Sequence, residues 1–223
     1  FAANYGGIPK NVRLHVTDRL YQTLPLYSNL GTTGVYVYAR DFDIQGRSAK
    51  VTAEAQVRNE HPAPRKFSYQ VTITGPDGKV VQTIQGGEHT LGAGETKTVG
   101  AGAKVSNLNF WSWGFGFLYD VATTLQVDGQ AVDTVVTRTG FRKLEFAKGV
   151  VKLNDRTLQM KGYAQRSTNE WPAVGQSVPP WLSDFSNGLM VEGNANLVRW
   201  MHVTPGKQDI ESCDRVGLLQ ALP

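Results

Sequence analysis

The sequence predicts a mainly β protein, in which an immunoglobulin-like β-sandwich is followed by a smaller part built from βα units. Three observations lead to this prediction. Over residues 31–146, apolar and polar residues alternate, a turn signal recurs about every ten residues, and no helical period is found. After residue 147, short apolar strands alternate with helical stretches, which is typical of a parallel sheet. The 24 glycines among 223 residues fit a chain rich in turns.

Charge and composition exclude several classes of function. The formal net charge is +4, but the basic residues are scattered, so no nucleic-acid-binding surface is expected. No apolar stretch reaches the roughly 18 residues of a membrane span, so no membrane segment is expected. No ligand cluster is visible either, so neither a metal nor another cofactor is expected. The single cysteine, Cys213, cannot form a disulfide within the chain.

Seven or eight strands are expected in the region that alternates with period two. The residue types explain two of the turns between them. At residues 76–78, proline presets one backbone angle and glycine supplies a positive φ, and Asp128-Gly129 is a strong hairpin signal. The expected strands are centred on residues 34–42, 51–57, 67–73, 80–84, 96–99, 118–125 and 131–138.

An aromatic-rich segment, residues 109–119, interrupts this region. One interpretation is a carbohydrate-binding platform, because sugar rings stack on aromatic faces. The other is packing in the core or at a domain junction, which large aromatic side chains also favour. Both interpretations stay open on the sequence alone.

The start of the chain has a strand pattern without a partner. Residues 11–16 alternate, with Val12, Leu14 and Val16 on one face, and one strand cannot bury that face by itself. Residues 21–29 contain Pro25 and lack periodicity, so a linker is expected there. No signal-peptide pattern or initial methionine is present, and both ends are expected to be cuts within a longer protein. The compartment stays open, with a periplasmic or secreted bacterial location favoured over a cytoplasmic one.

The last third of the chain predicts alternating strands and helices. A small hairpin around residues 150–156 precedes a strand over residues 158–163, which is followed by the polar residues Gln165 and Arg166. A helix is expected from Pro180, with an apolar residue every three or four positions, up to Gly193.

Residues 196–219 predict one complete βαβ unit. A short apolar strand at Leu197-Val198 leads to Arg199 and His202, and a helix then runs to Gly217, a natural helix C-terminal residue. Enzymes built on parallel strands carry their sites at the carboxyl ends of those strands. Arg199 and His202 are therefore candidate site residues.

The same stretch resembles a known signature. The pattern N-x-x-R-x-x-H-x-x-P, formed by Asn196, Arg199, His202 and Pro205 and followed by D-x-x-G at Gly217, is similar to the second barrel strand of family 2 glycoside hydrolases. One more residue separates the histidine from the proline than in the usual pattern. That family includes β-galactosidases, β-glucuronidases and β-mannosidases.

Other segments resemble the same family in the family's order. They are G-G-I-x-x-x-V-x-L at residues 6–14, Trp111-Ser112, Leu118-Tyr119, the G-F-R of residues 140–142, and the loop W-P-x-x-G of residues 171–175. The resemblance implies that residues 1–30 end an N-terminal jelly-roll domain and continue into a linker. It further implies an immunoglobulin-like sandwich over residues 31–146, and the first βα units of a (β/α)8 barrel over residues 147–223.

The family resemblance also implies a function. Family members are retaining β-glycosidases whose two catalytic glutamates lie on the fourth and seventh barrel strands, beyond these residues, so no catalytic residue is expected in this chain. The whole protein is expected to hydrolyse terminal β-linked sugars, most like a β-galactosidase, and this chain alone is expected to be inactive. The missing carboxylates would come from the rest of the same polypeptide or from a complementing chain, and homo-oligomerisation stays open.

Five residues are expected to form one wall of the sugar site. The resemblance implies that His202 hydrogen-bonds sugar hydroxyls, with a buried core histidine as the alternative. It implies that Arg199 pairs with a barrel carboxylate, and that Gln165 and Arg166 line the end of the first strand. Glu170 follows Asn169, as in the family's acid/base pair, but after the wrong strand. A rim residue and a plain loop carboxylate are the other interpretations.

A non-catalytic carbohydrate-binding or scaffold module and one chain of a two-chain glycosidase remain the alternative functions.

Overall fold

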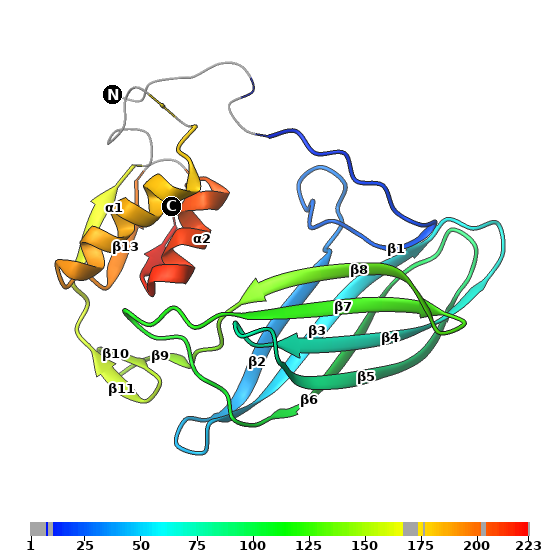
Figure 1. Cartoon of the computed structure of the whole chain (residues 1–223), viewed down its shortest axis with the longest axis horizontal. Coiled ribbons are helices and arrows are strands. Elements are labelled where there is room, and N and C mark those ends of the chain that lie inside the picture. The colour runs from blue at the N-terminus through cyan, green and yellow to red at the C-terminus, as the bar shows by residue number, and fades with distance from the viewer. Residues whose placement is uncertain (1–7, 9–10, 167–173, 176, 202–203, 223) are drawn as a thin grey trace. The chain divides into compact units, whose positions relative to one another are not determined.

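The computed structural model describes residues 8, 11–166, 174–175, 177–201 and 204–222, which form two compact units (Figure 1). The first, called the sandwich unit, comprises His15–Asn109 and Leu118–Phe141. The second, called the α/β unit, comprises Phe1–Leu14, Phe110–Phe117 and Arg142–Pro223. The segment Phe110–Phe117 therefore belongs to the α/β unit, although in sequence it lies between strands of the sandwich.

The sandwich unit consists of two antiparallel sheets. In Figure 1 the strands of the first sheet run behind those of the second. The first sheet contains β1 (Leu20–Gln22), β2 (Val35–Asp43), β3 (Ser48–Asn59) and β6 (Thr96–Val105), with β3 paired to the other three. The second has the order β5-β4-β7-β8 and contains β4 (Arg65–Thr74), β5 (Val80–Leu91), β7 (Tyr119–Val127) and β8 (Gln130–Thr139). The predicted mainly β class is confirmed.

The period-two pattern explains the core of this unit. Alternate residues of β3 and β4 are fully or almost fully buried, so each sheet turns one apolar face inward. The Tyr69 hydroxyl reaches from one sheet to the other and donates a hydrogen bond to the Ala53 carbonyl oxygen at 3.3 Å. The buried side chains of these two strands are Val51, Ala53, Ala55, Val57, Phe67, Tyr69, Val71 and Ile73.

The predicted turn at Asp128-Gly129 has the backbone that its sequence requires. Asp128 has φ 51° and Gly129 has φ 77°, and the two residues join β7 to β8. Two successive positive φ angles match the twist of the flanking strands, which is why Asp-Gly is favoured in two-residue hairpins. The connection is therefore set locally by these two residues.

The strand expected over residues 11–16 is not formed among the described residues, and its partners were expected upstream of this segment. Residues 11–18 pair with no strand among the described residues, and Val12, Leu14 and Val16 are between 80% and 90% exposed. The pattern suits a strand, but a single strand forms only where a partner supplies hydrogen bonds. The first strand instead lies inside the expected linker region, at Leu20–Gln22, where it pairs with β3.

The α/β unit starts with a three-stranded antiparallel sheet and continues with a three-stranded parallel one. The first sheet consists of β9 (Leu144–Ala147), β10 (Val150–Leu153) and β11 (Arg156–Leu158). The second consists of β12 (Gly162–Gln165), β13 (Leu197–Trp200) and β14 (Leu219–Ala221), in that order. Helix α1 (Pro180–Glu192) connects β12 to β13, and α2 (Lys207–Val216) connects β13 to β14. The predicted βαβ unit is confirmed, whereas the strand expected over residues 158–163 begins only at Gly162.

Helix α1 buries Leu182 together with three polar residues, while most of its large apolar side chains are exposed. The apolar residues Trp181, Phe185 and Leu189 are 67%, 54% and 49% exposed, while Ser183 and Asn187 are buried. The polar face packs against α2, because hydrogen bonds satisfy its buried groups. Ser183 donates to the Asp209 carboxylate at 2.7 Å, and the Asn187 amide donates to the Ser212 hydroxyl at 3.0 Å. Within the described residues, no helix is long and apolar enough to cross a membrane.

Candidate functional site

The parallel sheet of the α/β unit has two different faces. On β13, Val198 and Trp200 are buried in an apolar cluster with Cys213 of α2 and Leu218. Side chains alternate along a strand, so Arg199 projects from the opposite face. In the register of the sheet, Arg199 lies between Ala164 of β12 and Ala221 of β14. Small neighbours on both sides leave this exposed arginine free of crowding at the carboxyl ends of the strands.

Gln165 does not share this face with Arg199. It lies in register with Trp200, is 6% exposed, and its amide donates to the Ser186 hydroxyl of α1 at 3.3 Å. Arg166 follows directly at the end of β12 and is half-buried. Gln165 and Arg199, both predicted site residues, therefore lie on opposite faces of the sheet. His202 and Glu170 lie outside the described residues.

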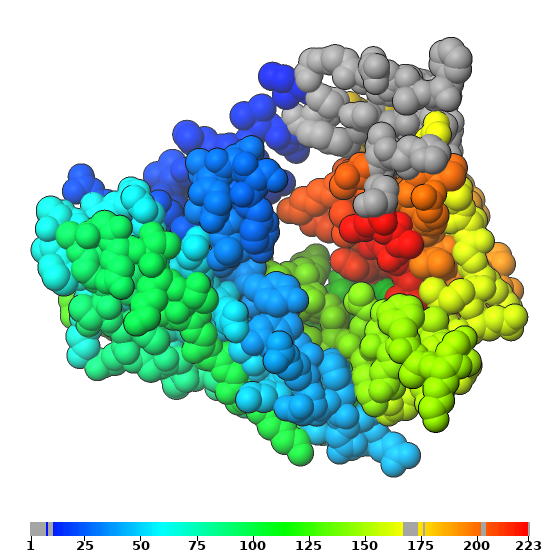
Figure 2. All heavy atoms as spheres, turned by 180° about the vertical axis from the view of Figure 1, so that it is seen from behind, coloured from blue at the N-terminus to red at the C-terminus, as the bar shows by residue number. Residues whose placement is uncertain are grey.

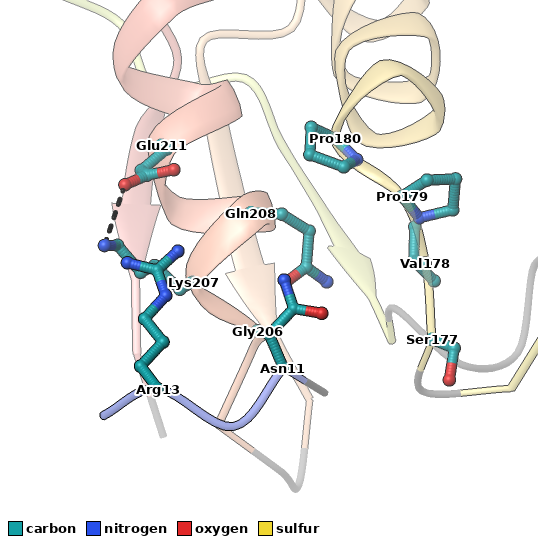
Figure 3. Close-up of a pocket in the computed structure, with 10 residues that line it drawn as sticks. All are labelled: Asn11, Arg13, Ser177, Val178, Pro179, Pro180, Gly206, Lys207, Gln208 and Glu211. Carbon is teal, nitrogen blue, oxygen red and sulfur yellow. Dashed lines mark ion pairs between the residues drawn. The ribbon is translucent and has the colours of Figure 1, made fainter. Parts of the chain in front are cut away.

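A hollow of about 650 Å³ lies where the two helices begin (Figure 3). Its lining includes Pro180 at the start of α1 and Lys207 at the start of α2, and Lys207 forms an ion pair with Glu211 at 3.4 Å. Neither Arg199 nor Gln165 lines it. The hollow and the exposed face around Arg199 are thus separate features. The other described residues that line the hollow are Asn11, Arg13, Ser177, Val178, Pro179, Gly206 and Gln208.

The aromatic segment Phe110–Phe117 contacts the amino-terminal ends of the parallel strands, opposite the ends where Arg199 lies. The Trp113 indole donates to the Ala195 carbonyl oxygen at 2.9 Å, just before β13. The Gly114 amide donates to the Gly217 carbonyl oxygen at 2.9 Å, just before β14. Contacts that precede the strands lie at their amino-terminal edge, where residues of parallel α/β folds serve stability rather than chemistry. The structure supports the packing interpretation for this segment.

Trp111 is the centre of this packing. It is 2% exposed, and its indole donates to the Asp214 carbonyl oxygen at 2.7 Å. The Arg142 guanidinium lies 4.9 Å from the centre of the Trp111 ring, within the range of a cation–π contact. The side-chain amide of Asn154 donates to the Trp111 carbonyl oxygen at 3.0 Å. The sequence placed Asn154 only within a small hairpin, because nothing local to it signals a partner 43 residues away.

Burial shifts the pKa values of the ionisable groups near Trp111. It lowers the pKa of Arg142, and it raises the pKa of Asp214, an effect that the nearby Arg142 charge partly opposes. Burial also raises the pKa of the Cys213 thiol. A thiol that stays protonated is a poor nucleophile and a poor metal ligand, so Cys213 acts as a small core residue. Among the described residues, no group of three or more histidine, cysteine, aspartate or glutamate side chains could hold a metal ion.

Residues 35–142 match the family model of the glycosyl hydrolases family 2. The chain is 31% identical to a β-glucuronidase of Formosa agariphila over 98% of its own length and 22% of that protein. It is 27% identical to a β-galactosidase of Vibrio cholerae over 82% of its length and 19% of that protein.

Solved structures of glycosidases share the fold of this chain. A β-glucuronidase from glycoside hydrolase family 2 superimposes with a TM-score of 0.86 and 29% identity, over 93% of this chain and 22% of that one. A putative β-galactosidase from Bacteroides fragilis shares the fold with a TM-score of 0.77, over 92% of this chain and 29% of that one. The two curated relatives and these two structures are all much longer, so the chain spans between about a fifth and three tenths of each. The chain belongs to glycoside hydrolase family 2.

Proposed function

We propose that this chain is part of a retaining β-glycosidase that hydrolyses terminal β-linked sugars. The observation that carries the proposal is the position of Arg199, at the carboxyl end of β13 and on the face of the sheet away from the helices. A parallel βα fold presents its chemistry at that end of its strands. The relatives, which are β-glucuronidases and β-galactosidases, support this class of reaction.

The proposed architecture is an immunoglobulin-like sandwich followed by the start of a (β/α)8 barrel. Strands β12, β13 and β14 are neighbours in sequence order, and the intervening helices α1 and α2 pack on each other. Such an order suits the first three strands of a barrel, whose interior would be the face that carries Arg199. The proposed boundaries remain residues 1–30 for the end of a jelly-roll domain and a linker, 31–146 for the sandwich and 147–223 for the barrel start. Within the linker, β1 pairs with β3 of the sandwich.

In this proposal the chain contributes a wall of the sugar site and no catalytic residue. Retaining glycosidases need two carboxyl groups about 5–5.5 Å apart, which later strands of the same polypeptide or a complementing chain would supply. Arg199 holds one of those carboxylates in place, while His202 binds sugar hydroxyls, with Arg166 and Glu170 at the rim. The buried hydrogen bond between Gln165 and Ser186 favours a positioning role for Gln165 rather than contact with the sugar.

A panel of nitrophenyl glycosides tests the proposed function on the full-length protein. We expect hydrolysis of a β-galactoside or a β-glucuronide with retained anomeric configuration, and no hydrolysis of the matching α-anomers. The first-formed sugar anomer, followed by NMR, reports the configuration. Absence of hydrolysis for every β-glycoside, combined with measurable sugar binding, would instead identify a non-catalytic carbohydrate-binding module.

His202→Ala in the full-length protein is expected to lower kcat/KM by about 10- to 100-fold. The loss corresponds to one or two hydrogen bonds to a bound sugar. His15→Ala is the matched control, because His15 is exposed on the segment that precedes β1. Kinetics equal to those of the unmodified protein would remove His202 from the site.

A further inference from the structure

The outer face of the first sheet of the sandwich unit carries a row of three basic residues. Arg40 of β2 is paired with Lys50 of β3, and Lys50 is paired with Lys104 of β6. All three side chains are exposed. Neighbouring strands are about 4.8 Å apart, so the three charges form a line about 10 Å long across the sheet. Figure 2 looks at the molecule from the side on which β2 and β3, coloured blue and cyan, face the viewer.

This row is not neutralised by the protein. Among the described residues, no ion pair involves Arg40, Lys50 or Lys104. Like charges directly opposite each other on neighbouring strands destabilise a sheet. Three of them in one line therefore indicate a surface that meets negative charge from outside the chain.

An aromatic stack adjoins the row on the same face. Tyr36 and Tyr38 precede Arg40 at two-residue steps along β2, so all three side chains project from one side. The ring centres of the tyrosines are 5.3 Å apart, and the Arg40 guanidinium lies 4.8 Å from the centre of the Tyr38 ring. The Tyr38 hydroxyl donates to the Glu54 carboxylate at 2.8 Å, which fixes that ring. Tyr36, at the end of the stack, is 61% exposed and offers a free apolar surface.

The remaining positions of this face are small or polar. Gly102 pairs with Thr52, and Gly100 pairs with Glu54, so β6 has no side chain at either position, on the far side of β3 from the tyrosines. A Cβ atom at Gly102 would lie 2.5 Å from the Thr52 hydroxyl oxygen, which shows that the threonine side chain occupies the space above the glycine. Beside the tyrosines, the Thr52 hydroxyl and the Glu54 carboxylate of β3 supply hydrogen-bonding groups, and beyond them the face is flat.

The pattern distinguishes one kind of polyanion from another. A nucleic acid carries a phosphate at every unit and would meet the Glu54 carboxylate with repulsion. A polysaccharide in which acidic and neutral sugars alternate fits both parts of the face. Its carboxylate or sulfate groups would lie on the basic row, while the hydroxyls of the neutral sugar would donate to Glu54 and its apolar ring face would stack on Tyr36.

We propose that the outer face of β2, β3 and β6 is a non-catalytic binding site for an acidic polysaccharide, with Arg40, Lys50 and Lys104 as the anion-binding row and Tyr36 as the stacking surface. This site lies wholly on the sandwich unit and does not depend on the proposed hydrolase activity. Its role would be to hold the protein on a polymeric carbohydrate.

Binding of hyaluronan, which alternates an acidic and a neutral sugar, tests the proposal on the full-length protein by isothermal titration calorimetry. We expect binding that weakens as the salt concentration rises, because exposed charges are screened. The triple variant Arg40→Gln, Lys50→Gln, Lys104→Gln is expected to lose about tenfold or more in affinity. Lys97→Gln is the control, because it removes the same charge from the same strand β6 at a position outside the row.

A second variant separates a carbohydrate site from a general anion site. Tyr36→Ala is expected to weaken hyaluronan binding at least about threefold and to leave the binding of a DNA duplex unchanged. Equal affinity of the triple variant and the unmodified protein for hyaluronan would overturn the proposal. DNA binding that is as tight as hyaluronan binding and equally sensitive to the triple variant would also overturn it. Neither result bears on glycoside hydrolysis, so the two proposals fail separately.

Discussion

Replacing Gly217 by alanine is expected to destabilise the protein by about 3 kcal/mol or more. Gly217 ends α2 with φ 78°, and its amide donates to the Cys213 carbonyl oxygen at 3.0 Å. A Cβ atom there would lie 2.6 Å from the Gly114 nitrogen and 2.6 Å from the Ser112 oxygen, both main-chain atoms that cannot turn aside. The left-handed backbone costs about 1 kcal/mol for alanine, overpacking adds about 1–3 kcal/mol, and the hydrogen bond from Gly114 is strained or lost.

Gly149→Ala is the matched control for this change. Gly149 has φ 75°, almost the same backbone, but no atom lies within 4 Å of the position that a Cβ would take. We expect this control to cost only about 1 kcal/mol, the price of the left-handed conformation. Urea unfolding of both variants measures the difference. An equal loss for Gly217→Ala and Gly149→Ala would show that the aromatic segment does not press on Gly217.

The sequence predicted the sandwich well because its signals are local. Alternation places Val51, Ala53, Ala55 and Val57 on one face whatever the rest of the chain does, and Asp128-Gly129 forms its turn with its own two backbones. Residues 11–16 form no strand among the described residues, for the complementary reason. Their alternation is equally clear, but no described strand supplies the partner that their hydrogen bonds require.

Helix α1 shows what periodicity cannot tell. The apolar spacing predicted its position and length, but of the apolar residues in that pattern only Leu182 is buried, and the other buried residues of the helix are polar. Ser183 and Asn187 are buried because Asp209 and Ser212 of α2 satisfy their hydrogen bonds. The hydrogen-bond partners lie about 25 positions away, so the pattern of a single helix cannot predict them.

The candidate site was predictable only in part, for a similar reason. The polar residues that follow the strands were recognised, but β12 begins at Gly162 rather than near Leu158. In a strand of four residues, the face of each side chain depends on pairing register. The register places Gln165 beside Trp200 and turns it toward the helices, while Arg199 projects from the other face.

Arg199→Lys in the full-length protein is expected to lower kcat/KM for a β-glycoside by about 10- to 100-fold. In the proposed barrel Arg199 would hold a carboxylate through two parallel hydrogen bonds, a geometry that the planar guanidinium provides and an ammonium does not. Loss of one charge-assisted hydrogen bond costs about 1.5–3 kcal/mol, which corresponds to about 10- to 100-fold in rate. Ala164 and Ala221 on the flanking strands leave no neighbouring side chain in the described sheet to take over this role.

Comparison with Arg199→Ala separates the charge of Arg199 from its geometry. Lysine keeps the positive charge that favours an ionised carboxylate, so the acidic limb of the pH–rate profile should stay in place for Arg199→Lys and move to higher pH for Arg199→Ala. Arg138→Lys is the control, since Arg138 pairs with Asp120 on the exposed surface of the sandwich at 2.9 Å. If both Arg199 variants kept the kcat/KM and pH profile of the unmodified protein and differed only in thermal stability, Arg199 would be a structural residue. The proposed wall of the sugar site would then lose its main support.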